Sequence, residues 1–484
     1  MKKQDVREPT LLLSIIPVLV LVALLFATIR TFGADALLGG NQIILLAAAA
    51  VSCLIAIFYC KIKWADIEHA IAKNIFGVVP AVLILLIIGA LAGAWMISGI
   101  IPTLIYYGIQ IINPSFYLVS TCIICAIVSL VIGSSWTTVA TVGVALLGIG
   151  QVHGISTAWT AGAIISGAYF GDKISPLSDT TILASSITET PLFTHIKYML
   201  VTTIPTMVIT LIIFTLAGLS YKSADTNQIM IYTASLKQTF NISIWLLIVP
   251  AVTFFLIIKK IPALITLFLS TFMAGIAALI AQPHLLNEIA GVEISGIVSK
   301  FKGLLMTLYG STAIETGNAE LNELVSTGGM AGMVNTVWLI ICAMTFGGVM
   351  IASGMFKRIT YAFIHLMKRT VSMVASTVSC GLFLTLTTAD QYIAILLTGN
   401  IFKDIYNKQG YESRLLSRTI EDAATVTSPL VPWNTCGMTQ ATILGVSTFT
   451  YLPYCFFNLI SPLMSIAIAA IGYKIFKRKT QGEI

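Results

Sequence analysis

A short polar segment at residues 171–181 interrupts a long apolar stretch and carries the residue types that bind small hard cations. It holds two carboxylates, Asp172 and Asp179, together with one lysine, one proline and four hydroxyl side chains. Pro176 has no amide hydrogen and disfavours helical backbone at Ser175, so carbonyl oxygens beside it lose their intrahelical partners. Hard cations prefer carboxylate, carbonyl and hydroxyl oxygens. The segment therefore predicts a broken helix that forms part of a Na+ site.

A carboxylate inside a membrane requires a specific role, because a charge at the bilayer centre costs at least ~2.5–3.5 kcal/mol. Burial disfavours the ionised form and so favours binding of H+, until Na+ supplies a compensating positive charge. Asp172 and Asp179 are therefore predicted to bind Na+ and H+ in turn. The alternative is a structural ion pair in which Lys173 holds one of these carboxylates, with Asp172 the first choice.

Three further segments carry similar chemistry. Residues 421–435 contain two acids, two prolines and several hydroxyl or amide side chains, and residues 133–138 read Gly-Ser-Ser-Trp-Thr-Thr. Asp390 is the only formal charge between Thr370 and Phe402, and its alternative interpretation is a carboxylate in a water-facing loop. Taken together, the predicted Na+/H+ site comprises Asp172, Ser175, Ser178, Asp179, Thr180, Ser134, Ser135, Thr137, Asp390, Asp422, Ser428 and Asn434.

The two halves of the chain contain related motifs. The Ser-Pro-Leu of residues 175–177 recurs at residues 428–430, a shift of 253, and the same shift pairs Thr137 with Asp390. Charged residues flank the related segments in opposite ways, which indicates repeats of inverted topology. We therefore predict two inverted repeats, over residues 61–200 and 314–460.

The elements that position these segments are expected to be membrane helices. Of the 484 residues, 57% are hydrophobic and 10% charged, and residues 74–171 and 423–473 contain no Asp, Glu, Lys or Arg. A water-soluble globule cannot bury that much apolar surface. We predict one all-α polytopic membrane domain over residues 1–484, with broken helices and about 11–14 transmembrane or re-entrant segments. Residues 78–112 and 371–402 fit either a pair of crossings or a hairpin.

The span positions follow from the need for roughly 20 apolar residues per crossing. Predicted spans begin near Leu11, Gln42, Val78, Ser115, Ser134, Ala158, Tyr198, Ile242, Pro262, Met333, Val371, Tyr392, Glu421 and Thr450.

The net charge of +7 comes from basic clusters beside the predicted span ends, which is the positive-inside pattern of membrane proteins and does not indicate a nucleic-acid partner. These clusters, assigned to the cytoplasm, are residues 1–7, Lys61 and Lys63, and residues 357–369, 403–418 and 474–479. Both termini are then cytoplasmic, in a multi-pass protein of the cell inner membrane. Expected partners are Na+, H+ and lipid, with no cofactor; a homodimer is left open. No hydrolase triad, zinc motif or phosphate loop favours an enzyme.

At these motifs the sequence resembles the NhaC family of Na+/H+ antiporters, through residues 133–138, 171–181 and 427–435. It departs from the family's Thr-Trp-x-x-Ser-Gly pattern at Ala94, which takes the place of the threonine. The resemblance implies a transporter with inverted repeats that exchanges Na+ for H+ by alternating access. Similar family members exchange malate and protons for Na+ and lactate, so an organic-anion exchanger is the alternative. The site segments contain no arginine, which disfavours a clamp for dicarboxylates.

Overall fold

The chain is helical over the part that the computed structural model describes, which is residues 7–32, 39–221, 226–259, 261–291, 296–318, 321–322, 325–364 and 369–477. Within these ranges, two isolated β-bridges join Thr312 to Thr327 and Tyr411 to Lys477. Both chain ends lie outside the described residues, as do most of the basic cluster at residues 1–7 and part of the one at 474–479. The expected location of the termini therefore stays a prediction.

By length and apolar composition, nine segments of the described chain can cross a membrane. They are α1 (Leu11–Phe32), α2 with a π-helical end (Gly40–Tyr59), α3 (Trp64–Ile97), α5 with a 3-10 start (Pro114–Ile132), α6–α7 (Ser135–Val152), α10 (Leu192–Gly218), α13 (Ala263–Ala281), α17–α18 (Gly329–Ala352) and α20 (Thr370–Thr388). The count becomes eleven if two bent pairs each form one span. The first joins the end of α11 (Thr226–Thr239) to a segment that ends with α12 (Ile248–Ile258), and the second joins a segment that begins with α24 (Thr448–Tyr451) to α25 (Phe456–Ile471). The prediction of an all-α polytopic membrane protein with broken helices is confirmed.

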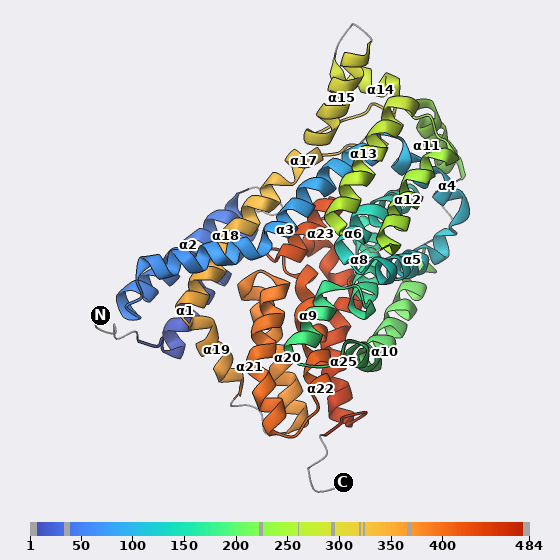
Figure 1. Ribbon diagram of the computed structural model, residues 1–484. Helices are drawn as coiled ribbons and strands as arrows, with labels where there is room; N and C mark the ends of the chain where they lie inside the picture. Colours follow the sequence, from blue (N-terminus) through green and yellow to red (C-terminus); the bar gives the residue numbers. More distant parts are fainter. Residues whose placement is uncertain are drawn as a thin grey trace.

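Shorter helices complete the fold and carry the polar segments. They are α4 (Ile100–Ile111), α8 (Thr157–Ile174), α9 (Asp179–Ile187), α14 (Pro283–Ala290), α15 (Ile297–Tyr309), α19 (Met355–Ile364), α21 (Gln391–Lys408), α22 (Ser413–Ile420) and α23 (Thr435–Leu444). The structure shows the helices of both ambiguous regions: the first is not a pair of full crossings, and the second fits either interpretation. In the first, the 34-residue α3 is followed by the 12-residue α4, which at about 18 Å is too short to cross. In the second, α20 and α21 pack side by side as a helical hairpin (Figure 1).

The helix α3 begins at Trp64, well before the predicted start at Val78. Its first turns contain the charged residues Asp66, Glu68 and Lys73, which sequence reasoning excluded from a span. A helix of 34 residues is about 51 Å long, whereas the hydrocarbon core is about 30 Å thick. One continuous helix can therefore hold these charges outside the hydrocarbon and still cross it.

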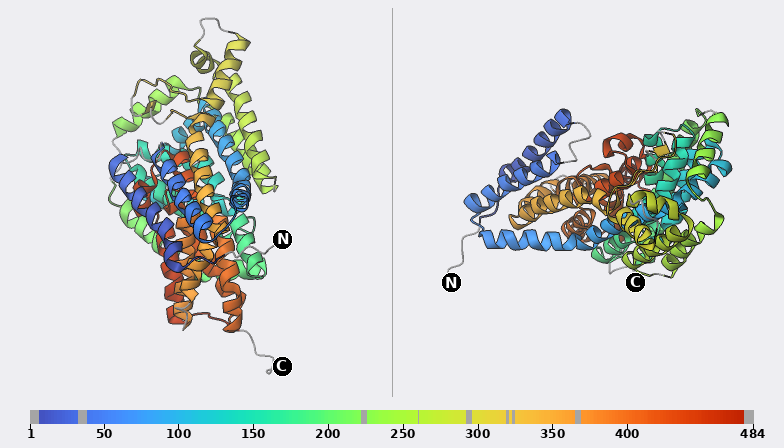
Figure 2. Two further views of the ribbon diagram at one scale, coloured as in Figure 1. Left: turned by 90° about the vertical axis from the view of Figure 1, so that its left-hand side faces the viewer. Right: turned by 90° about the horizontal axis from the view of Figure 1, so that it is seen from above.

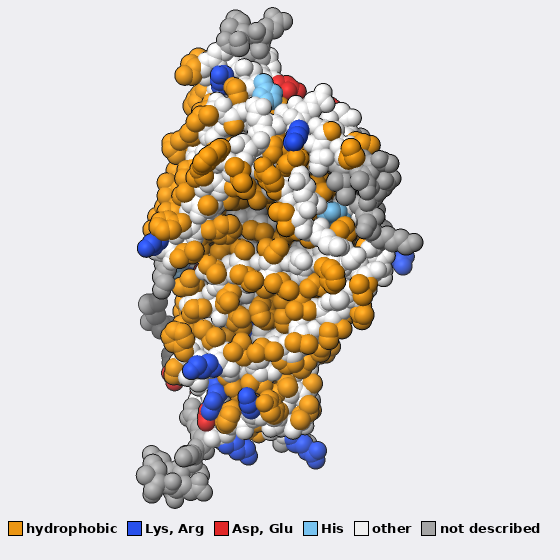
Figure 3. Space-filling model, turned by 90° about the vertical axis from the view of Figure 1, so that its right-hand side faces the viewer, with side chains coloured by type: hydrophobic (Ala, Val, Ile, Leu, Met, Phe, Trp, Pro, Cys, Tyr) orange, Lys and Arg blue, Asp and Glu red, His pale blue; other side chains and the backbone are white. Residues whose placement is uncertain are grey.

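The helices form two groups (Figures 1 and 2). The first contains α1–α3, α13–α15, α17 and α18, which pack on one another. The second contains α5–α10 and α20–α25, with α8 at its centre between α5, α7, α10 and α25. In the space-filling view, hydrophobic side chains cover the middle of the surface, and Lys and Arg side chains cluster at its lower end, with single ones at the upper end and the sides (Figure 3). This distribution matches a molecule whose middle lies in lipid.

Small residues let α8 lie very close to α5. A Cβ atom built on Gly167 would come within 2.1 Å of the Cys122 carbonyl oxygen, and one on Gly171 within 2.2 Å of the Ala126 oxygen. Because membrane helices associate by close packing more than by the hydrophobic effect, small residues at such contacts fix the helix spacing. The glycines therefore hold α8, and the polar segment that follows it, against α5.

We expect Gly167→Ala to destabilise the protein by roughly 1–3 kcal/mol, the usual range for overpacking. The added methyl group meets backbone atoms of α5, which cannot move aside as a flexible side chain would. Thermal unfolding of the purified protein in detergent measures the effect. Gly332→Ala is the matched control, since a Cβ atom there has no neighbour within 4 Å. Equal stability of the two variants would contradict the close contact.

Left-handed backbone positions recur in the two halves at a nearly constant spacing. Four pairs of residues with positive φ are 255 or 256 positions apart, namely Gly99 with Gly354, Gly133 with Ala389, Gly154 with Gly410, and Glu189 with Gly445. Such positions end or begin helices, so the order of helices and turns is alike in the two halves. The repeat boundaries and their opposite orientation stay predictions.

Candidate functional site

Two sharp turns bring polar residues to the ends of helices in the middle of the molecule. The first joins α5 to α6 (Ser135–Thr138) through Gly133, with φ of 73°, and the extended Ser134, whose hydroxyl accepts a hydrogen bond from the Thr137 amide. The second joins α20 to α21 through Ala389, with φ of 58°, and the extended Asp390. Both turns are N-caps in which a side-chain oxygen satisfies a free amide of the first helical turn.

The predicted break in residues 171–181 is present. Helix α8 ends at Ile174, Ser175 and Ser178 are extended, and α9 starts at Asp179. Asp172 therefore lies in the last turn of α8. The helix ends before Ser175 because Pro176 disfavours helical backbone in the residue that precedes it. The second break follows a π-helical turn at Glu421–Thr425 and a 3-10 turn at Ser428–Leu430, and it ends where Asn434 caps α23.

These turns and the first break surround one cavity of about 630 Å³. Three carboxylates line it, those of Asp172, Asp179 and Asp390. The predicted site residues Ser134, Ser135, Thr137, Ser178 and Thr180 line it as well. No Lys, Arg or His of the described chain does so. These carboxylates and hydroxyls come from the second helix group, whereas one further hydroxyl residue of the lining, Thr266, lies on α13.

The opposite wall of the cavity is almost wholly apolar. It comes from α3 and from the start of α13 with the end of α12, and its residues include Val78, Ala81, Ile84, Ile257 and Leu267. The cavity thus lies where the two helix groups meet, with its three carboxylates on one group only.

Asp172 and Asp390 are held in place by hydrogen bonds. One carboxylate oxygen of Asp172 accepts from both the amide and the hydroxyl of Ser135, at 3.1 and 2.7 Å, and the side chain is 7% exposed. Asp390, 2% exposed, accepts from the amide of Ile393 at 3.0 Å and from the hydroxyl of Thr435 at 3.1 Å. Both carboxylates are therefore preorganised, and neither has a basic residue as partner.

Each of the three carboxylates lies at the N-terminus of a helix. Asp172 accepts from the first amide of α6, Asp179 is the first residue of α9, and Asp390 caps α21. A helix N-terminus is equivalent to about +0.5 elementary charge. If all three acids are ionised, the helix N-termini offset only part of their charge and the cavity stays negative. That charge suits one monovalent cation together with a proton.

Four predicted site residues lie outside the cavity lining. The Ser175 hydroxyl donates to the Leu130 carbonyl at 2.8 Å, and that of Ser428 donates to the Thr425 carbonyl at 2.7 Å. Asn434 accepts from the Cys436 amide at 3.0 Å as the cap of α23. These three stabilise the broken segments.

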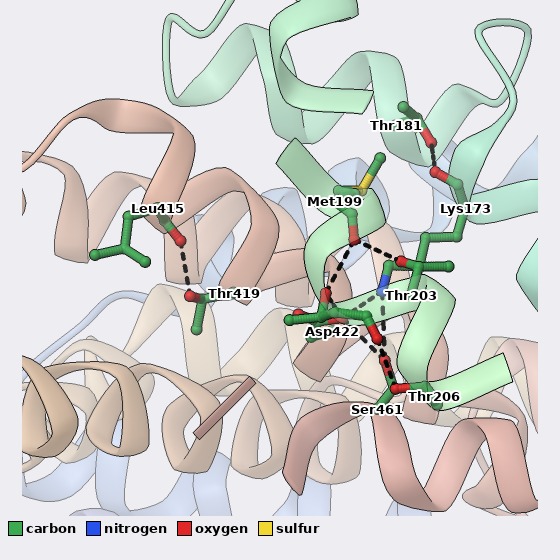
Figure 4. A network of polar contacts seen from close by, with 10 residues as sticks. Lys173, Thr181, Met199, Thr203, Thr206, Leu415, Thr419, Asp422 and Ser461 are labelled. Carbon is green, nitrogen blue, oxygen red and sulfur yellow. Dashed lines mark hydrogen bonds and ion pairs between the residues drawn. The ribbon is translucent and has the colours of Figure 1, made fainter. Parts of the chain in front are cut away.

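The fourth, Asp422, belongs to a separate buried cluster. It forms an ion pair with Lys173, and both side chains are fully buried. Figure 4 shows Lys173 reaching from α8 toward Asp422 and Ser461, and the same Asp422 oxygen accepts from Ser461 at 2.9 Å and from Thr202 at 3.3 Å. Lys173 does hold a carboxylate, as the structural alternative proposed, but that of Asp422 and not that of Asp172.

Sequence reasoning missed two further buried charges beside this cluster. Arg418 is fully buried with its guanidinium 4.7 Å from the centre of the Tyr198 ring, and none of its nitrogens has a hydrogen-bond acceptor in the described chain. Arg418 was predicted to belong to the cytoplasmic basic cluster of residues 403–418, whereas its side chain is buried inside the protein. Glu421 is also fully buried; Thr425 faces its carboxyl without a hydrogen bond of good geometry. Arg418 and Glu421 are three positions apart, so they lie on one face of the helix just before a broken segment. This spacing was the signal available in the sequence.

The offset between the halves also differs from the sequence prediction. A shift of 253 pairs Thr137 with Asp390, whereas the helix caps pair Ser134 with Asp390 and Ser178 with Asn434, each 256 apart. The caps are the better guide, because they mark equivalent backbone positions.

Membrane-crossing helices that are broken around a cavity lined by carboxylates define a polytopic ion transporter of the secondary, gradient-driven class. Comparison with known proteins agrees. Residues 167–473 match the Na+/H+ antiporter family. The chain belongs to the NhaC family of Na+/H+ antiporters.

Three relatives show what this family includes. The Na+/H+ antiporter NhaC of Bacillus subtilis is 35% identical over 89% of this chain and 91% of its own. The malate-2H+/Na+-lactate antiporter of the same organism is 36% identical over 86% of each chain. The arginine/ornithine antiporter ArcD of Halobacterium salinarum is 32% identical over 98% of this chain and 94% of its own. All three are antiporters and none is an enzyme, while their cargoes differ.

Proposed function

We propose that this protein exchanges Na+ for H+ by alternating access, with Asp172, Asp179 and Asp390 as the carboxylates that the two ions share. The observation that carries the proposal is one cavity with three acids, five of the predicted hydroxyl residues and no lining cation in the described chain. The name and similarity of the Bacillus subtilis NhaC support the same activity.

The geometry suggests how the ions compete. The hydroxyls of Ser135 and Ser178 both face Asp172, so a cation beside this carboxylate finds neutral oxygens next to the charge. Na+ neutralises part of the local negative charge, and a proton that binds one carboxylate removes the charge of that carboxylate. Occupation by one ion therefore weakens the binding of the other, which is the condition for exchange.

Reconstituted liposomes test the proposal. An imposed Na+ gradient should drive proton movement, recorded by a trapped pH dye, in vesicles that contain the protein and not in empty ones. Absence of Na+-driven proton movement in vesicles with correctly inserted protein would reject the antiport.

A second candidate is Na+- and H+-coupled exchange of organic anions, which the name of the malate/lactate relative favours. The cavity argues against it, because carboxylates repel an organic anion and no basic side chain of the described chain lines the wall. Proton movement that requires added malate or lactate would make this candidate the better one.

We further place the protein in the cell inner membrane with both termini in the cytoplasm. The gathering of Lys and Arg at one end of the molecule supports this orientation (Figure 3). Labelling of a C-terminal cysteine tag from the periplasmic side of intact cells would contradict it.

A further inference from the structure

The cavity is much larger than a bare Na+ ion requires. At about 630 Å³ it has room for roughly 20 water molecules at about 30 Å³ each, and it falls in the range of about 300–1,000 Å³ that is typical of small-molecule sites. We propose that the cavity also accepts a small organic cation, a compound with a primary ammonium or guanidinium group, as cargo in place of Na+. This inference rests on the proposed antiport and names a further substrate class for the same site.

The charge distribution selects a cation over an anion or a neutral molecule. Asp172 and Asp390 are fixed by their own hydrogen bonds, and Asp179 is exposed at the start of α9. With all three acids ionised, the helix N-termini offset only part of their charge, so a net negative charge remains for the ligand. An ammonium or guanidinium group can donate several hydrogen bonds to such carboxylates.

The two walls match the two ends of an organic cation. The carboxylates and all lining hydroxyl residues except Thr266 occupy one wall, and the other presents mainly aliphatic side chains such as Val78, Ile84 and Leu267. A hydrated Na+ gains nothing from the aliphatic wall, whereas the carbon chain of an organic cation loses contact with water there. The split therefore fits an amphipathic ligand.

Aromatic residues complete the match. Tyr392, 37% exposed, follows Asp390 by two residues and lines the cavity, and the face of an aromatic ring attracts organic cations. Trp136 lines it too and is 8% exposed. Its indole N–H has no hydrogen-bond acceptor of good geometry in the described chain. A buried donor without a partner is costly, and a water that accompanies the cation in the cavity would satisfy it.

Agmatine is the probe, because its guanidinium stays charged and prevents it from crossing the bilayer as a neutral base. In liposomes with the intact protein, we expect saturating agmatine to reduce Na+-driven proton movement at least fivefold. Radiolabelled agmatine should accumulate in exchange for internal Na+ or H+, above the level in empty vesicles. Butanediol and malate at equal concentration should do neither.

A variant separates specific binding from general charge effects. Tyr392→Leu should raise the agmatine concentration for half-inhibition at least fivefold more than it raises KM for Na+. Tyr309→Leu, on the exposed face of α15 and away from the cavity, is the matched control. It should change neither the agmatine concentration for half-inhibition nor KM for Na+.

The outcomes are distinguishable. If Na+ drives proton movement but agmatine neither inhibits nor accumulates, or if butanediol or malate acts as strongly, the organic-cation inference is rejected and the antiport stands. If Na+ drives no proton movement, the antiport is rejected. Agmatine uptake in the same vesicles then supports or rejects this cargo by itself.

Discussion

Replacing Asp172 with asparagine is expected to reduce Na+-dependent proton movement at least tenfold. Asparagine has the same shape, and its amide oxygen can still accept from Ser135, so the turn before α6 stays in place. The variant loses the charge and the proton-binding oxygen. An interaction with a charged group contributes about 1.5–3 kcal/mol, which corresponds to roughly tenfold or more. Initial rates in liposomes at several Na+ concentrations measure the loss.

Asp390→Asn should have an effect of similar size for the same reason. Asparagine is as good an N-cap as aspartate, so α21 keeps its capping interaction while the cavity loses a charge. Asp179→Asn should reduce transport as well, by less, because this carboxylate is exposed to water. Asp404→Asn, an exposed change on the same helix as Asp390, is the control. Full activity of the Asp172 and Asp390 variants would place the ion site elsewhere.

The central part of this site was accessible from sequence because it depends on local rules. A proline disfavours helix in the residue before it, so the break at Ser175 follows from Pro176 alone. An isolated acid such as Asp390 in a long uncharged stretch must lie in a protected environment, and it lines the cavity with Asp172. Local backbone rules and the cost of a charge in lipid together indicated which segments line the cavity.

The pairing of buried charges was not accessible in the same way. Lys173 and Asp422 are 249 positions apart, and their contact depends on how α8 packs against the turn after α22. Asp172 precedes Lys173 directly, yet on a helix adjacent residues point about 100° apart and serve different neighbours. The burial of Arg418 was hidden for a related reason, since a cluster of basic residues in sequence does not reveal which of them faces inward.

The ion pair between Lys173 and Asp422 should dominate stability. Asp422→Leu leaves the Lys173 ammonium fully buried without a carboxylate, and removing one member of a buried pair typically costs about 3–5 kcal/mol. We expect this variant to lose its monodisperse peak in size-exclusion chromatography and to unfold at a lower temperature. Lys403→Met breaks the exposed pair with Glu189 and should cost only about 0–1 kcal/mol.

The double variant Lys173→Met with Asp422→Leu decides what the pair does. Removing both charges eliminates the unpaired ammonium, and apolar replacements of buried pairs are often neutral or stabilising. The hydroxyl of Thr202 keeps its bond to the Met199 carbonyl, so the buried Ser461 hydroxyl is the one group of this cluster that loses its acceptor. Failure of the double variant to recover the fold would contradict a pairwise contribution to stability. Recovery of fold and transport together would assign the pair to structure, whereas recovery of the fold alone would show that transport requires the charges themselves.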